Sequence, residues 1–177
     1  MQTTGSPLRP RWWNDQYDSA WDRVKDALKR DFEQTRRDFG SKTAPELNQD
    51  LTDTVKQAVG AQPIPPDNVP NAPASAWSEH ENALRYGYGA GLSETYRPHK
   101  NWSDPLSNDL EHEWTELKHG RRWEDVQESV RAGFERARLS VQSNVYNRKA
   151  EVFGHVLFEV AVVGSLSASG QVLQVYP

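Results

Sequence analysis

Hydrophobic residues recur along the chain with helical spacing, in a unit that begins with a tryptophan. An aliphatic residue follows the tryptophan after three positions, a second follows four positions later, and an aromatic residue comes four beyond that. Because the α-helix has 3.6 residues per turn, these four side chains fall on one stripe, which we expect to be buried. Two segments share the pattern without a gap: Trp21, Val24, Leu28 and Phe32, and Trp123, Val126, Val130 and Phe134.

Two further segments repeat the unit less closely, one with the same spacing and one with an inserted residue. The sequence therefore predicts an all-α fold, a helical bundle of about five helices built from repeated tryptophan-led amphipathic units. The apolar positions of the two weaker copies are Trp77, His80, Leu84 and Tyr88, and Trp102, Leu106, Leu110 and Trp114.

Glycines mark the expected ends of the helices, because glycine readily adopts the left-handed conformation that follows a last helical turn. Asp18 or Ser19 is the expected N-cap of the first helix. The five helices are expected over residues 17–39, 45–59, 77–89, 104–119 and 123–149. A narrow apolar stripe is expected on the second: Leu47, Leu51, Val55 and Val59. The first four should end at Gly40, at Gly60, at the group Gly87, Gly89 and Gly91, and at Gly120.

Prolines divide the chain. Five of the residues from 61 to 75 are proline and only Asp67 is charged, which predicts an extended linker without regular secondary structure. The predicted organisation is a flexible basic and aromatic arm (1–13), an N-terminal helical pair (14–60), the linker (61–75), a C-terminal three-helix unit (76–150) and an apolar tail (151–177).

The last segment differs in composition from everything before it. From Val152 to Pro177 the only charged residue is Glu159, and two apolar runs flank a stretch of small residues. This pattern predicts a β-hairpin; the alternatives are that the first run prolongs the fifth helix, or that the tail is foreign to the domain. A tail this apolar must be covered, and we expect it to help form an interface between copies of the chain.

Composition and charge exclude several classes of protein. The 177 residues carry a net charge of −4 with both signs well mixed, whereas dedicated nucleic-acid-binding proteins are usually basic. The chain has no cysteine, which excludes disulfides, thiol nucleophiles and thiolate metal sites. Residues 1–10 lack the apolar core of a signal peptide, and no apolar run reaches the roughly 18 residues of a membrane span. We therefore expect a cytoplasmic protein with no membrane span.

Two histidines lie between glutamates, a pattern that can occur in the metal sites of helical bundles. His80 occupies a core position of the tryptophan-led unit, so we expect a buried, hydrogen-bonded histidine. His112 lies beside an apolar stripe and is expected on a solvated face. We predict no catalytic residue, metal site or cofactor, since no nucleophile or phosphate-loop motif occurs in a fitting context.

Arginines interleaved with aromatic residues are the best candidates for contacts with a partner. Arginine can hold phosphates while aromatic rings stack on bases, so nucleic acid is one candidate partner. A protein partner or self-association is favoured, because acids of the first and fifth helices would repel a polyanion. The candidate contact residues are Arg9, Arg11, Trp12, Trp13, Arg85, Tyr86, Lys118, Arg121 and Arg122.

Four motifs resemble a loosely defined group of uncharacterised bacterial proteins. Those proteins carry repeated Arg-Tyr-Gly-Tyr, Trp, Leu-Glu-x-x-Trp and Val-Arg-x-Gly-Trp/Phe elements and are often linked with general stress responses. The resemblance covers about residues 77–135 and implies a bacterial, cytoplasmic, stress-associated helical protein without assigned catalytic residues. The matching motifs are Leu84-Arg-Tyr-Gly-Tyr88, Trp102-Ser-Asp-Pro-Leu106, Leu110-Glu-His-Glu-Trp114 and the segment from Trp123 to Phe134.

These observations favour a non-enzymatic helical interaction or scaffold protein. The alternative is a nucleic-acid-associated protein that uses the arginine and aromatic residues named above, and a metal-dependent helical enzyme is a distant third hypothesis. Salt-dependent binding of nucleic acid separates the first two, and elemental analysis of the purified protein tests the third.

Overall fold

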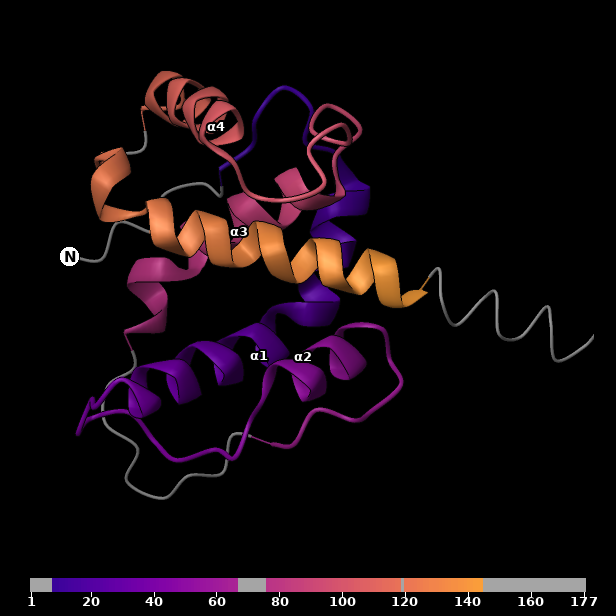
Figure 1. Cartoon of the computed structure of the whole chain (residues 1–177), viewed down its shortest axis with the longest axis vertical. Coiled ribbons are helices and arrows are strands. Elements are labelled where there is room, and N and C mark those ends of the chain that lie inside the picture. The colour runs from indigo at the N-terminus through magenta and orange to yellow at the C-terminus, as the bar shows by residue number, and fades with distance from the viewer. Residues whose placement is uncertain (1–7, 67–75, 119, 145–177) are drawn as a thin grey trace, which may run out of the picture. The chain divides into compact units, whose positions relative to one another are not determined.

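The computed structural model describes residues 8–66, 76–118 and 120–144, and its helices are drawn in Figure 1. By its internal contacts the chain divides into a compact unit, Met1–Val141, and a second unit, Gln142–Pro177. The described residues contain helices and no strand, so the all-α prediction is confirmed for them. The elements are α1 (Asp15–Asp38), α2 (Leu51–Ala58), α3 (Trp77–Leu92), α4 (Asp104–Glu116), the 3-10 turn η1 (Trp123–Asp125) and a final helix over 127–144.

A polar cap and a left-handed glycine set the two ends of α1. The N-cap is Asn14, whose side-chain oxygen accepts a hydrogen bond from the Gln16 amide at 2.9 Å. The prediction of Asp18 or Ser19 as the cap is therefore wrong, because the helix has already begun at those positions. Gly40 follows α1 with a φ of +90°, as predicted.

Helix α2 begins later than predicted. Asn48 adopts a left-handed conformation with a φ of +48°, which a continuous helix cannot contain. Asp50 then caps the helix, since its side chain accepts a hydrogen bond from the Asp53 amide at 2.7 Å. The segment from Pro45 to Asp50 is thus an irregular connection rather than a first helical turn.

The buried face of α2 is polar. Thr54 and Gln57 are buried, whereas Leu51 of the predicted apolar stripe is 44% exposed. Gln49 joins this face to α1. Its amide donates to Thr54 Oγ1 and Gln57 Oε1 at 3.0 Å each, and its oxygen accepts from Arg30 Nε at 3.2 Å. Hydrogen bonding, and not an apolar stripe, therefore orients α2 on α1.

Helix α3 runs through the glycines that were predicted to end it, and that prediction is wrong. Gly87 and Gly91 face the final helix, where the absence of side chains lets the two backbones meet. A Cβ atom on Gly87 would lie 1.9 Å from the Val130 carbonyl oxygen. One on Gly133 would lie 2.2 Å from that of Leu84. These glycines therefore provide close packing of two helices rather than helix termination.

Most positions of the tryptophan-led stripes are buried, as predicted, whereas His80 and Trp102 are only partly buried. The rings of Trp21 and Trp77 stack with centroids 6.1 Å apart and planes 3° apart. Phe32 is only half-buried at the edge of this cluster, and Trp123 lies in η1, so the final helix begins at 127 rather than at 123. The buried members are Trp21, Val24, Leu28, Trp77, Leu84, Tyr88, Leu106, Leu110, Trp114, Trp123, Val126, Val130 and Phe134.

One hydrophobic cluster joins the two predicted halves of the chain. Leu28 of α1 lies in the same cluster as Leu84 and Tyr88 of α3. Elements before and after the predicted linker thus share one compact unit, and separate units at 14–60 and 76–150 do not match this packing.

Two predictions fall partly or wholly outside the described residues. Residues 61–66 have no regular secondary structure, as predicted, while the rest of the linker, 67–75, is not described. The apolar tail also lies outside, and its hairpin and its interface remain predictions.

Gly133→Ala should destabilise the protein, since the added methyl group would collide with backbone rather than with a movable side chain. Overpacking of this kind costs about 1–3 kcal/mol, which urea unfolding will measure as a lower free energy of unfolding. Gly120→Asn is the control for strain without collision: no atom lies within 4 Å of the missing Cβ, so any loss of stability there comes only from the φ of +81°. Equal stability of Gly133→Ala and wild type would contradict the close crossing.

Candidate functional site

Residues 8–13, which we call the N-terminal strap, are packed on the helices. Leu8 and Trp13 are buried, which contradicts the prediction of a flexible arm for this part of residues 1–13. The ring of Trp13 contacts α3 at Gly89, where a Cβ atom would lie 2.2 Å from the ring. The strap can take this position because α3 has no side chain there.

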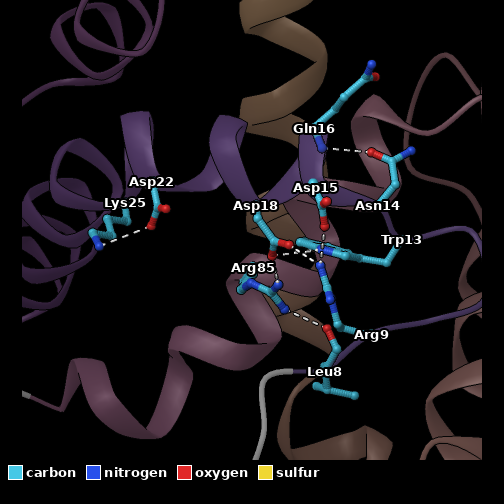
Figure 2. A network of polar contacts seen from close by, with 10 residues as sticks. All are labelled: Leu8, Arg9, Trp13, Asn14, Asp15, Gln16, Asp18, Asp22, Lys25 and Arg85. Atoms are coloured by element: carbon cyan, nitrogen blue, oxygen red, sulfur yellow. Dashed lines mark hydrogen bonds and ion pairs between the residues drawn. The ribbon is translucent and has the colours of Figure 1, made fainter.

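Arg85 of α3 holds the strap through three contacts, shown in Figure 2. It donates from Nη1 to the Leu8 carbonyl at 2.6 Å and from Nη2 to Asp18 Oδ1 at 2.5 Å. Its guanidinium also lies over the Trp13 ring, 3.8 Å from the centroid, as a cation–π contact. Asp18 accepts further hydrogen bonds from Trp13 Nε1 at 3.0 Å and from Arg9. The result is a closed network between the strap, α1 and α3.

A second set of contacts converges on Glu113 of α4. Trp12 Nε1 donates to its two carboxylate oxygens at 2.9 and 3.0 Å. The hydroxyl groups of Tyr86 and Tyr96 donate to Oε2 at 2.7 and 3.2 Å. Burial, reinforced by the charge of Glu113, raises the pKa of Tyr86 well above its ordinary value, so the phenol stays a donor. Glu113 is not among the contact residues predicted from the sequence. Its position next to Trp114 of the apolar stripe is the only sequence feature that points to this role.

The predicted contact residues fall into two groups. Those of the strap and α3 are mostly engaged within the fold, with Tyr86 fully buried. Arg11 is the exception, being exposed without a recorded side-chain partner among the described residues. The engaged residues are Arg9, Trp12, Trp13, Arg85 and Tyr86; the second group is Lys118, Arg121 and Arg122.

The second group lines a surface hollow of about 390 Å³ between the end of α4 and η1. A neighbouring hollow of about 350 Å³ is lined by residues of α3 and shares Trp114 and Arg121 with the first. We call the two together the Arg121 cleft. Acidic residues also border it: Glu79, Glu111 and Glu124.

Hydrogen bonds fix the loop that carries these cations. Trp114 donates its indole N–H to the Arg121 carbonyl at 2.9 Å, and the Arg121 guanidinium donates to the Glu79 carbonyl of α3. Arg122 pairs with Asp125 at 3.0 Å. The loop is therefore tied to both helices that flank the cleft.

Lys118 differs from the other two cations because no side-chain partner is recorded for it in the described part of the chain. It follows the C-cap of α4, the position where glycine is favoured, and its φ is +50°. A left-handed conformation costs a residue with a Cβ atom about 1–2 kcal/mol. The fold thus holds an exposed ammonium group, without a partner among the described residues, beside the cleft at a conformational cost.

The two histidines singled out in the sequence occupy different environments. His80 is half-buried with Nδ1 2.8 Å from Ser129 Oγ, which confirms a hydrogen-bonded histidine. Burial, together with the charge of Arg121, lowers its pKa and so disfavours protonation of the ring. His112 is exposed, 3.8 Å from Glu116, on a solvated face as predicted. Over residues 8–66, 76–118 and 120–144, no group of three metal-ligand side chains is found.

No protein-family model, no curated protein sequence and no solved structure matches this chain. Within the described residues, none of the helices has the length and apolar character needed to cross a membrane. The strap and the Arg121 cleft are therefore the features of this fold that bear on its function.

Arg85→Lys should loosen the strap, because lysine keeps the charge but lacks the planar fork that reaches Leu8 and Asp18 and stacks on Trp13. We expect a loss of about 1–3 kcal/mol in the free energy of unfolding, measured by urea denaturation. Arg11→Lys is the matched control, since Arg11 is an exposed residue of the same strap. If both variants are as stable as wild type, Arg85 does not hold the strap.

The stabilising effect of Asp18 should disappear at low pH. Burial opposes its ionisation, but hydrogen bonds from Trp13 and Arg85 outweigh burial and hold its pKa below the ordinary value of 3.8. A carboxylate whose pKa is lower in the folded than in the unfolded state stabilises the protein at pH values above its unfolded-state pKa. This stabilisation is lost as the pH falls through the folded-state pKa. Asp18→Asn should be less stable than wild type at neutral pH, and the difference should narrow below about pH 4. A constant difference through that range would argue against the network.

Proposed function

We propose that this protein is a non-enzymatic helical interaction module, and that the Arg121 cleft binds an acidic segment of a partner protein. The separation of the candidate contact residues supports this most strongly. Arginine and aromatic residues of the strap serve the fold, whereas Lys118, Arg121 and Arg122 line an open cleft. Arg121 is bound to the Glu79 carbonyl and Arg122 to Asp125, so Lys118 is the cation of this group that is most available to a negatively charged ligand.

Apolar surface adjoins positive charge in this cleft. Trp114 and Trp123 contribute to its walls, and Lys118 supplies an ammonium group that no described carboxylate neutralises. A protein segment with carboxylates next to an apolar side chain would satisfy both features, because burial of the apolar part adds to the ionic attraction.

Mixed charge around the cleft favours a protein over a nucleic acid. Glu111 and Glu124 border the same hollow and would repel a continuous phosphate backbone. Trp13 and Tyr86, which the sequence offered as residues that could stack on bases, are buried within the fold and lie outside this hollow. Nucleic-acid binding is therefore the alternative, and it is an outcome of the test below.

The biological setting is also a proposal. The resemblance over about residues 77–135 implies a bacterial protein linked with stress responses, and we propose that the module acts in the cytoplasm of such a cell. Self-association through residues 151–177 is a separate prediction, which the described residues do not reach.

Fluorescence anisotropy with a short labelled peptide of glutamate, aspartate and leucine tests the cleft directly. Wild type should bind the peptide saturably, and higher salt should weaken the complex. Lys118→Glu should weaken it about tenfold or more, since reversal of one charge replaces attraction by repulsion. Lys118 is exposed, so the substitution should leave the fold intact.

Arg11→Glu is the matched control, because it makes the same change of charge at an exposed position outside the cleft. It should bind the peptide within about twofold of wild type. An unlabelled single-stranded oligonucleotide serves as competitor. Tighter binding of the oligonucleotide, with the same sensitivity to Lys118→Glu, would support the alternative. No peptide binding, or equal weakening by both variants, would overturn the proposal.

A further inference from the structure

Arg138 of the final helix has no acidic partner among the described residues. Its Nη2 donates to the Tyr96 carbonyl at 2.7 Å, and its guanidinium lies 5.1 Å from the centroid of the Phe134 ring. A half-buried arginine normally requires a negative partner to offset its lost hydration. Three other buried or half-buried arginines have one: Arg85 with Asp18 at 2.5 Å, Arg136 with Asp31 at 2.9 Å and Arg36 with Glu33 at 2.8 Å.

The guanidinium of Arg138 is also incompletely hydrogen-bonded. Its Nε is the one enclosed side-chain nitrogen or oxygen without a partner over the described ranges. Its Nη1 makes no recorded hydrogen bond there and is not enclosed, so it reaches the surface. Enclosed polar groups nearly always have partners, so an exception such as this Nε requires a specific explanation.

Further positive charge lies beside Arg138. Burial, together with the charge of Arg97 on the loop between α3 and α4, lowers the pKa of Arg138. Lys100 is exposed on the same loop. The His99 amide donates at 3.0 Å to the Tyr96 carbonyl that also accepts from Arg138, so this loop and the guanidinium are joined at one oxygen.

Acidic residues on the same elements are already paired. Glu94 of the loop binds Arg97 at the exposed surface. Glu135, one helical turn before Arg138, binds Arg131 at 2.9 Å. Glu94 therefore offsets the charge of Arg97 at the surface, whereas no described carboxylate balances Arg138.

We propose that Arg138 and Arg97 bind an oxyanion of the phosphate class beside the loop between α3 and α4. Guanidinium groups bind phosphate oxygens through planar, charge-assisted pairs of hydrogen bonds. An oxyanion bound here draws the exposed Arg97 side chain away from Glu94 and gives Arg138 the negative partner it lacks. This site is distinct from the Arg121 cleft and does not depend on the proposed function.

Isothermal titration of the full chain with inorganic phosphate tests the site, with sodium chloride at matched ionic strength as the reference. Wild type should bind phosphate. Arg97→Gln should weaken binding about tenfold or more, because it removes one charge-assisted contact. Arg97 is exposed, so this variant should fold normally. Arg138→Lys keeps the charge but loses the fork, and should weaken binding as well.

Arg131→Gln is the matched control, since Arg131 is an exposed arginine of the same helix that is paired with Glu135. It should bind phosphate like wild type. Sulfate should compete with phosphate, and acetate should compete poorly. Phosphate binding no stronger than that of chloride, equal weakening by Arg131→Gln and Arg97→Gln, or equal competition by acetate would overturn the proposal.

Discussion

Close approach to α3 through its glycines is the constraint on which the rest of the structure depends. Gly87 and Gly91 meet the final helix, and Gly89 meets the Trp13 ring of the strap. Residues four apart lie on one face of a helix, while the residue midway between them points to the other side. Three glycines cost a helix about 1.5–3 kcal/mol relative to alanine, so α3 is stable because both faces are covered.

The motif from Arg85 to Tyr88 shows how this constraint distributes roles. Arg85 holds the strap, Tyr86 donates to Glu113 of α4, Gly87 admits the final helix and Tyr88 packs into the cluster of α1. Four consecutive residues thus contact four different parts of the fold. In sequence this arginine–aromatic motif resembles a nucleic-acid-binding surface. In the structure its residues connect the strap and the helices to one another within the core.

Sequence reasoning succeeded where the signal was local. Helical spacing alone predicts the stripe of Trp21, Val24 and Leu28, and its burial is confirmed. It failed where a distant partner decides the outcome. The local preference of glycine predicts that Gly87 ends a helix. In the structure Gly87 lies inside α3 and packs against Val130 of the final helix.

The same limit applies to α2 and to the strap. An apolar stripe on α2 is a local signal. Its hydrogen bonds with Gln49, which Arg30 of α1 in turn binds, are not visible in the sequence of α2 itself. The position of the strap cannot be predicted from its own sequence either, because Trp12 is held by Glu113, a residue 101 positions away. The sequence is enough to name candidate contact residues. Only the structure shows which of them lie in the core and which line the cleft.

Hydrogen–deuterium exchange of the amides of residues 84–92 tests the central claim most directly. A continuous α3 covered on two sides predicts slow exchange through all three glycines, comparable with that of the buried middle of α1 around Leu28. Rapid exchange from Gly87 onward, at the rate of the exposed turn at Gly40, would show that α3 ends at the glycines and would contradict the account.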